Sequence, residues 1–113
     1  MSTRMRIAAV IAAGAAVIAA APALGATKTI NVKTTSGLMF SGMPSTLKAG
    51  TYKFVYRNTS GIDHNLRVGS KKTPTFDEGT MTITVKLKRG KVKYECTVSG
   101  HAAGGMKGTI TVK

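Results

Sequence analysis

The stretch YECTVSGHAAGGMKG, residues 94–108, carries the most specific information in the chain. Cys96, His101 and Met106 follow one another at intervals of five residues, and Cys96 is the only cysteine. The residues between them are mostly small, which lets one loop wrap around a single ion. A thiolate, an imidazole and a thioether are donors that suit copper. The stretch therefore predicts a metal loop after a strand, and the rest of the chain must supply any further ligand.

Hydrophobic and polar residues alternate along most of the chain after residue 26, as expected for half-buried β-strands. The clearest case is 51–57, where the aromatic residues take one face and the charged residues the other. The other predicted strands cover residues 30–33, 64–68, 81–87, 92–96 and 108–112, with a polar loop over 69–79. No segment shows a helical period of useful length. Short strands with frequent turns favour an all-β antiparallel sandwich or barrel in one domain.

The N-terminal segment has the features of a secretory signal peptide. Two arginines precede an unbroken apolar run over residues 7–21. We expect cleavage after Ala26, giving a signal peptide 1–26 and a domain 27–113, with cleavage after Ala23 as the second choice. An uncleaved membrane anchor is the alternative, but the run is short for a membrane span. The expected location is therefore secreted, periplasmic or on the exterior of the cell envelope.

The chain is strongly basic, with 17 lysines and arginines against 4 acidic residues and a net charge of +13. Such a charge suits acidic proteins, anionic lipid headgroups or nucleic acid. Secretion argues against nucleic acid, and so does the strand 51–57. Its aromatic and basic residues lie on opposite faces, whereas a stacking groove needs both on one surface. We expect redox proteins with acidic docking surfaces as partners, and an anionic membrane surface stays open as a second partner.

The lone Cys96 needs an explanation in a small secreted domain, where disulfides are the usual stabilising element. A buried free cysteine is often only a small hydrophobic residue. A bound metal would explain the unpaired thiol and would also stabilise the domain. His64, the only histidine besides His101, stands where a loop meets a predicted strand, so an antiparallel fold can bring the two histidines together.

Two imidazoles and a thiolate in a near-trigonal plane, with a weak thioether, make up a blue copper site. The expected ligands of one copper ion are therefore His64, Cys96, His101 and Met106. Asn65 and Thr97 are expected to hydrogen-bond to each other and hold the cysteine loop in place.

On these residues the chain resembles a cupredoxin, a type 1 blue copper protein of the plastocyanin and azurin family. GLMFSGMPSTLKAGTYKFVYRNTSGIDHNLRV, residues 37–68, resembles the first half of plastocyanin, and CTVSGH, residues 96–101, resembles the azurin ligand loop. The C-x4-H-x4-M spacing is nearest to auracyanin and rusticyanin. The resemblance implies an eight-stranded Greek-key β-sandwich that binds one type 1 copper ion and transfers single electrons.

Two positions bear on what this resemblance implies. Asp63 stands where azurin has a glycine whose carbonyl approaches the metal. Whether the carbonyl of Asp63 makes such a fifth contact stays open. Glu95 and Thr97 flank the cysteine, and neither is a histidine that bridges to a second copper. We therefore expect an electron carrier and not an enzyme.

The expected carrier is a monomer that passes the electron through the edge of His101. A docking patch of small and apolar residues is expected around this edge, made of Leu38, Met39, Ala102, Ala103 and Gly104. Lysines at its rim would steer an acidic partner. An envelope copper carrier or scavenger with the same ligands is the alternative, and a metal-free basic adhesin is a weaker one. A nucleophilic Cys96–His101 pair lacks a clear orienting third residue.

Overall fold

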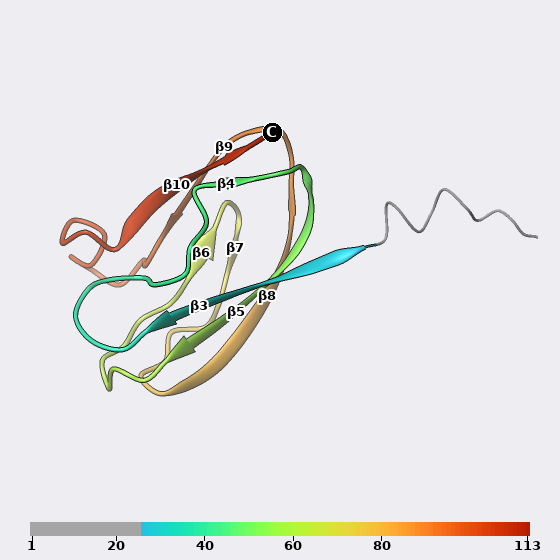
Figure 1. Cartoon of the computed structure of the whole chain (residues 1–113). Helices are drawn as coiled ribbons and strands as arrows, with labels where there is room; N and C mark the ends of the chain where they lie inside the picture. The colour runs from blue at the N-terminus through green and yellow to red at the C-terminus, as the bar shows by residue number, and fades with distance from the viewer. Residues whose placement is uncertain (1–25) are drawn as a thin grey trace, which may run out of the picture.

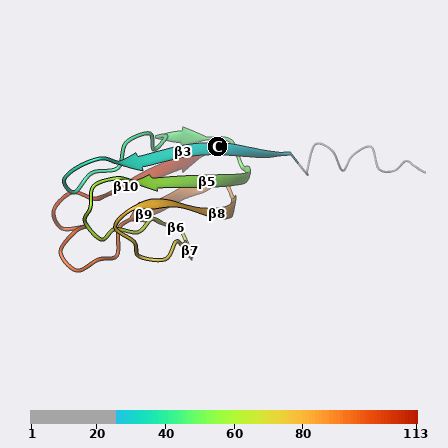
Figure 2. The same cartoon turned by 90° about the horizontal axis from the view of Figure 1, so that it is seen from below.

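The computed structural model describes residues 26–113 and shows a sandwich of two facing β-sheets (Figures 1 and 2). One sheet has three strands in the order β3-β5-β8, with bounds Thr27–Thr34, Gly50–Asn58 and Gly79–Leu87. The other has five strands in the order β4-β10-β9-β6-β7, with bounds Thr46–Leu47, Lys107–Val112, Gly90–Glu95, Arg67–Val68 and Lys71–Lys72. The expected signal peptide lies outside the described residues, apart from Ala26. No helix among residues 26–113 is long and apolar enough to cross a membrane.

The all-β Greek-key sandwich expected from the sequence is confirmed. Antiparallel pairing throughout is wrong, because β3 pairs with β5 and β4 with β10 in parallel. After β3 the chain crosses to the other sheet as β4 and then returns as β5. A strand that returns after such a crossover runs parallel to the strand it left.

Two local expectations are corrected. The segment 69–79 is not loop throughout, because β7 lies within it and pairs with β6. The strand expected over 64–68 is regular only at β6, while His64 forms an isolated bridge with Phe76. β6 and β7 have only two residues each, so their pairing depends on tertiary neighbours more than on a local pattern.

The core lies between the sheets and follows the alternation of β5. Tyr52, Phe54 and Tyr56 are buried, whereas Lys53 and Arg57 on the opposite face are exposed. The other buried hydrophobic members of this core are Val32, Leu66, Val68, Phe76, Val85, Leu87, Ile110 and Val112.

A buried hydrogen bond of 2.7 Å joins the Tyr56 hydroxyl to Thr34 Oγ1 in this core. Burial raises the pKa of Tyr56 to about 12, although the hydrogen bond with Thr34 acts in the opposite direction. Tyr56 therefore stays neutral and serves as a packing residue with one satisfied polar atom.

The two ends of the sandwich differ in construction. The site end is formed by the loops over residues 35–40, 59–66, 73–78 and 97–105. Main-chain hydrogen bonds such as Gly61 N–H to Asp77 O join 59–66 to 73–78, and Thr59 N–H to Thr34 O joins 59–66 to the end of β3. The basic end lies opposite and holds the turns at 48–49 and 88–89, the start of β3 and the C-terminus (Figure 1).

Candidate metal centre

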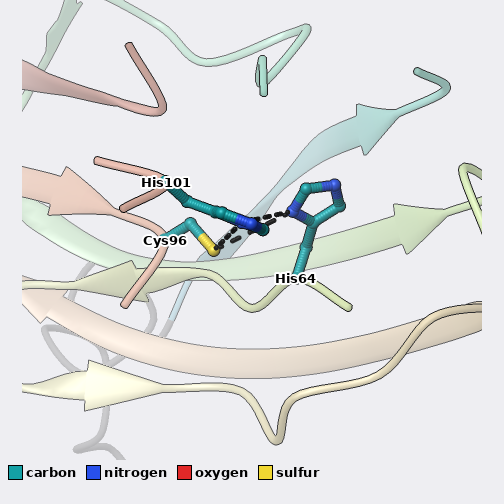
Figure 3. A group of neighbouring side chains, drawn as sticks. All are labelled: His64, Cys96 and His101. Atoms are coloured by element: carbon teal, nitrogen blue, oxygen red, sulfur yellow. Dashed lines mark hydrogen bonds between the residues drawn. The ribbon is translucent and has the colours of Figure 1, made fainter. Parts of the chain in front are cut away.

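His64, Cys96 and His101 come together at the site end (Figure 3). Their candidate ligand atoms all lie within 4.8 Å of one another. The two Nδ1 atoms are 3.1 Å apart, and Cys96 Sγ lies 3.5 Å from His101 Nδ1 and 3.9 Å from His64 Nδ1. Two donors from one stretch and a third from a distant loop thus converge on one point.

His64 is held by main-chain pairing on both sides of its Cα atom. Its N–H donates to Phe76 O and its carbonyl accepts from Phe76 N–H, each at 3.0 Å. Asn58 Nδ2 also donates to Phe76 O at 2.7 Å, which anchors the bridge to the end of β5. The His64 side chain is fully buried, so its ring position is set by packing as well as by the backbone.

Cys96 directly follows β9, which ends at Glu95. Its N–H donates to Met106 O at 3.0 Å, so the two ends of the ligand loop are tied at the base. The thiol is fully buried. A buried thiol fixed at a strand end has a defined position and little access to solvent.

The ligand loop 97–105 is closed by turn hydrogen bonds. His101 N–H donates to Val98 O, and His101 O accepts from Gly104 N–H and Met106 N–H. The loop needs a positive φ at Gly100, where φ is 85°, a region that favours glycine. These turns bring the half-buried His101 back over Cys96.

Asn65 connects the His64 loop to the ligand loop. Its Oδ1 accepts from Thr97 N–H at 2.8 Å, and its Nδ2 donates to Thr97 Oγ1 at 2.8 Å. Nδ2 also donates to Thr75 Oγ1 at 2.8 Å. The residue is almost fully buried, so the arrangement fixes the position of the chain next to Cys96.

Met106 is fully buried and begins the approach to β10. Its carbonyl accepts from Cys96 and its N–H donates to His101, which places its backbone between two of the converging residues. Its role as a thioether ligand stays a prediction.

The residues of the expected docking patch lie at the same end. Met39 is 66% exposed, and Ala103 and Gly104 are exposed as well. Leu38 is half-buried and packs closely on Gly104, since a Cβ added there would come within 2.6 Å of Leu38 Cδ1. The loop before β4 and the ligand loop are thus in direct contact.

The electrostatics of His64 favour its neutral form. Burial is the main cause that lowers its pKa below 6.5, and the neighbouring His101 lowers it further. The backbone of Gly37 and the charge of Asp63 act in the opposite direction. A neutral imidazole is the form that binds a metal.

The donor set fits one copper ion. His64, Cys96 and His101 are positioned to bind it with two imidazole nitrogens and a sulfur. Nε2 of His64 is buried without a hydrogen-bond partner among the described residues and lies on the side of the ring away from Cys96 (Figure 3). The Nδ1 atoms are therefore the nitrogens that face a shared ion.

Phe76 and Thr75 are supporting residues that the sequence did not indicate. Phe76 pairs with the backbone of His64, and Thr75 accepts a hydrogen bond from Asn65. Both stand in a polar segment without alternation, so no local signal pointed to them.

No family model matches the sequence, and no curated protein matches it. The fold does match solved structures of auracyanins and rusticyanins. Dithionite-reduced auracyanin from Roseiflexus castenholzii has a TM-score of 0.68 and 23% identity, over 79% of this chain and 99% of that chain. Rusticyanin from Thiobacillus ferrooxidans has a TM-score of 0.60 and 23% identity, over 77% of this chain and 80% of that chain.

A blue copper oxidase from Nitrosomonas europaea matches with a TM-score of 0.67 and 14% identity. The match covers 39% of that protein and 78% of this chain. The match is thus to a part of a larger protein. The chain has the cupredoxin fold, and its His-Cys-His cluster is like that of a blue copper site.

Proposed function

We propose that the chain is a secreted blue copper protein that carries single electrons between redox proteins. The convergence of a buried thiol with two imidazole Nδ1 atoms within 4.8 Å supports this most directly. The auracyanin and rusticyanin folds support it further. Copper, when bound, would supply the one-electron change between Cu(I) and Cu(II), with Met106 as the weak fourth ligand.

The chain's own contribution is to hold the donors still. Two Phe76 hydrogen bonds fix His64, and the Met106 carbonyl fixes Cys96. Asn65 joins these two parts through Thr97. A site whose donors do not move between oxidation states needs little reorganisation, which favours fast electron transfer.

The half-buried His101 is the proposed route for the electron, because His64 and Cys96 are fully buried. The patch of Leu38, Met39, Ala102, Ala103 and Gly104 would give a partner a weakly polar contact around it. Small, weakly bound interfaces are usual for brief redox encounters.

The charges at the site end bear on which partner surface it would attract. Lys107 is the basic residue next to Met106, but Asp63 and Glu95 directly precede two proposed ligands. The site end is thus mixed in charge. We propose that apolar contact governs docking there, and that steering of an acidic partner by lysines is a secondary effect.

The proposal is of a monomeric carrier and not of an enzyme. Glu95 and Thr97 beside Cys96 offer no imidazole to bridge to a second copper. Titration of the purified protein with Cu(II) tests the assignment. We expect an intense thiolate-to-copper absorption in the visible region that saturates at one equivalent. Binding without that band would rule out the type 1 site.

A copper carrier or scavenger in the envelope is the second candidate, favoured by the exposed Met39 near the ligand loop. Exchange with a Cu(I) chelator separates the two. A protein that delivers copper should release it to the chelator within seconds to minutes. A protein that carries electrons should retain its copper over hours.

A further inference from the structure

The acidic residues lie toward one end of the long direction of the sandwich, whereas the cations are spread over both ends. The chain has four acidic residues, and all belong to the site end or its border: Asp63, Asp77, Glu78 and Glu95. Asp63 precedes His64, Asp77 follows Phe76, and Glu95 precedes Cys96. Glu95 is also in register with Arg67 and Lys107, which offset its charge.

The basic end carries exposed cations and none of these acids. Its members are Lys28, Lys48, Lys86, Lys88, Arg89, Lys91 and Lys113. The strand pairing relates two of them, because Thr51 of β5 lies opposite Lys86 in β8 and opposite Thr27 in β3, which directly precedes Lys28. Hydrogen bonds from Ala49 N–H to Lys113 O and from Lys113 N–H to Leu47 O bring the C-terminus beside the 48–49 turn.

A hollow of 440 Å³ lies within this end and is lined by three of the lysines, Lys28, Lys48 and Lys86. Lys28 lies in β3 and Lys86 lies in β8, the two strands that flank β5. Tyr52 lines the floor and donates from its hydroxyl to Lys48 O at 2.7 Å, which steadies the turn. The hollow thus has a fixed backbone and flexible ammonium groups around it.

We propose that the basic end binds the surface of an anionic phospholipid bilayer, with a headgroup phosphate in this hollow. Six of the seven cations are lysines, which bind phosphate as point charges and need no fixed bidentate geometry. They project from several strand ends over one end of the molecule, an arrangement that suits a flat charged surface. Each lysine near such a surface adds to the attraction.

The chain also enters the sandwich at this end, since Ala26 lines the hollow. Residues 7–21 form the apolar run that precedes it in the sequence. Bound in this way, the domain directs the site end away from the lipid, where His101 is open to a soluble partner. The inference does not depend on copper.

Sedimentation with lipid vesicles tests the binding. Residues 27–113 contain every strand and every core residue that the structure describes, so this segment serves as the test protein. We expect it to sediment with vesicles of phosphatidylcholine containing about 30% phosphatidylglycerol and not with phosphatidylcholine alone. Binding should disappear at 1 M salt, where the screening length is about 3 Å. Equal binding to both vesicle types would overturn the proposal.

Two triple variants locate the surface. Replacing Lys28, Lys48 and Lys86 by Gln should weaken partitioning about fivefold per lysine and about 100-fold together. The matched control replaces Lys33, Lys53 and Arg57 by Gln, which removes the same charge from the outer face of β3 and β5. The control should lose less than tenfold. An equal loss in both would show that net charge alone binds the lipid, and would overturn the role of the basic end. Thermal melts of both variants confirm that the fold is kept.

The orientation is tested with single tryptophans, because the chain has none. Ala49→Trp places one in the hollow and Ala103→Trp places one at the site end. Energy transfer to a dansyl-labelled lipid should be strong from the first and weak from the second. The reverse order would overturn the proposed orientation.

A competition experiment with soluble dextran sulfate tests for a different anionic partner. If dextran sulfate binds more tightly than the vesicles do, and this binding also needs Lys28, Lys48 and Lys86, the basic end binds a polyanion and the lipid proposal is overturned.

Discussion

The site end and the basic end are built from the two ends of the same strands, yet they hold their functional side chains in different ways. At the site end, main-chain hydrogen bonds and the buried Asn65 fix the residues that converge on the metal. At the basic end, exposed lysines project from strand ends and short turns. Precise coordination needs rigid, buried donors, whereas attraction to a charged surface needs only the number and placement of charges. Loss of one of the three converging donors should therefore abolish the copper site, whereas loss of one lysine at the basic end should only weaken binding to the charged surface.

The largest effect is expected for Cys96→Ser. The variant should lose the intense visible band completely, because a hydroxyl cannot replace the thiolate in the charge-transfer transition. Absorption after addition of one equivalent of Cu(II) measures it. Lys48→Gln at the basic end is the control and should keep the full band. A Cys96→Ser protein that stays blue would refute the ligand set.

Met106→Leu should keep the band and mainly raise the reduction potential, since loss of a weak axial donor favours the reduced ion. Voltammetry of the two proteins measures the shift. An unchanged potential would remove Met106 from the ligand set and leave the three converging residues in place.

Asn65→Ala should destabilise the fold by about 2–3 kcal/mol, because it leaves Thr97 N–H without its hydrogen-bond partner and removes the bonds to two threonine hydroxyls. Denaturant unfolding of the copper-free protein measures this. The exposed change Ser70→Ala should stay within about 0.5 kcal/mol. A similarly small effect of Asn65→Ala would mean that the two loops are held together by packing alone.

Two glycines near the metal centre differ in what an added Cβ would meet. A Cβ on Gly108 would overlap the Tyr94 ring, which packs edge-on against Phe40 with ring centroids 5.9 Å apart. Gly108→Ala should cost about 1–2 kcal/mol for this overpacking. Gly104→Ala meets only the tip of Leu38 and should cost less, about 0.5 kcal/mol. Thermal unfolding of both variants decides the order, and the reverse order would contradict this comparison.

The smallest effect concerns pH. The folded pKa of His64 lies below its unfolded value of 6.5, so the unfolded chain takes up a proton first as the pH falls. Stability from this group is complete above 6.5 and declines as the pH falls below it. We expect the melting temperature of the copper-free protein to fall from pH 7.5 to pH 5. His64→Gln should flatten this dependence, and an unchanged slope would assign it to other groups.

Much of the fold was predictable because the long strands are amphipathic. The aromatic face of β5 and the alternation of β8 indicate their inward residues without any tertiary information. The parallel pairing of β3 with β5 was not predictable, because it follows from a crossover through β4, which has only two residues. β7 was missed for the same reason, since two exposed lysines carry no hydrophobic pattern.

For the site, the residue types and spacing of Cys96, His101 and Met106 were enough to predict a metal loop. His64 followed from the scarcity of histidine in the chain. The supporting roles of Thr75 and Phe76 could not be inferred, because they depend on which loop lies beside which.

The sequence by itself determined the long strands, the candidate donors and the total charge, since alternation, ligand chemistry and composition are local properties of the chain. The tertiary structure decided three further things. It set the distances between His64, Cys96 and His101, the hydrogen bonds of Asn65 to Thr97, and the position of seven cations at the end opposite the acids. Each of these depends on segments far apart in sequence, and only the packing of the two sheets brings them into contact.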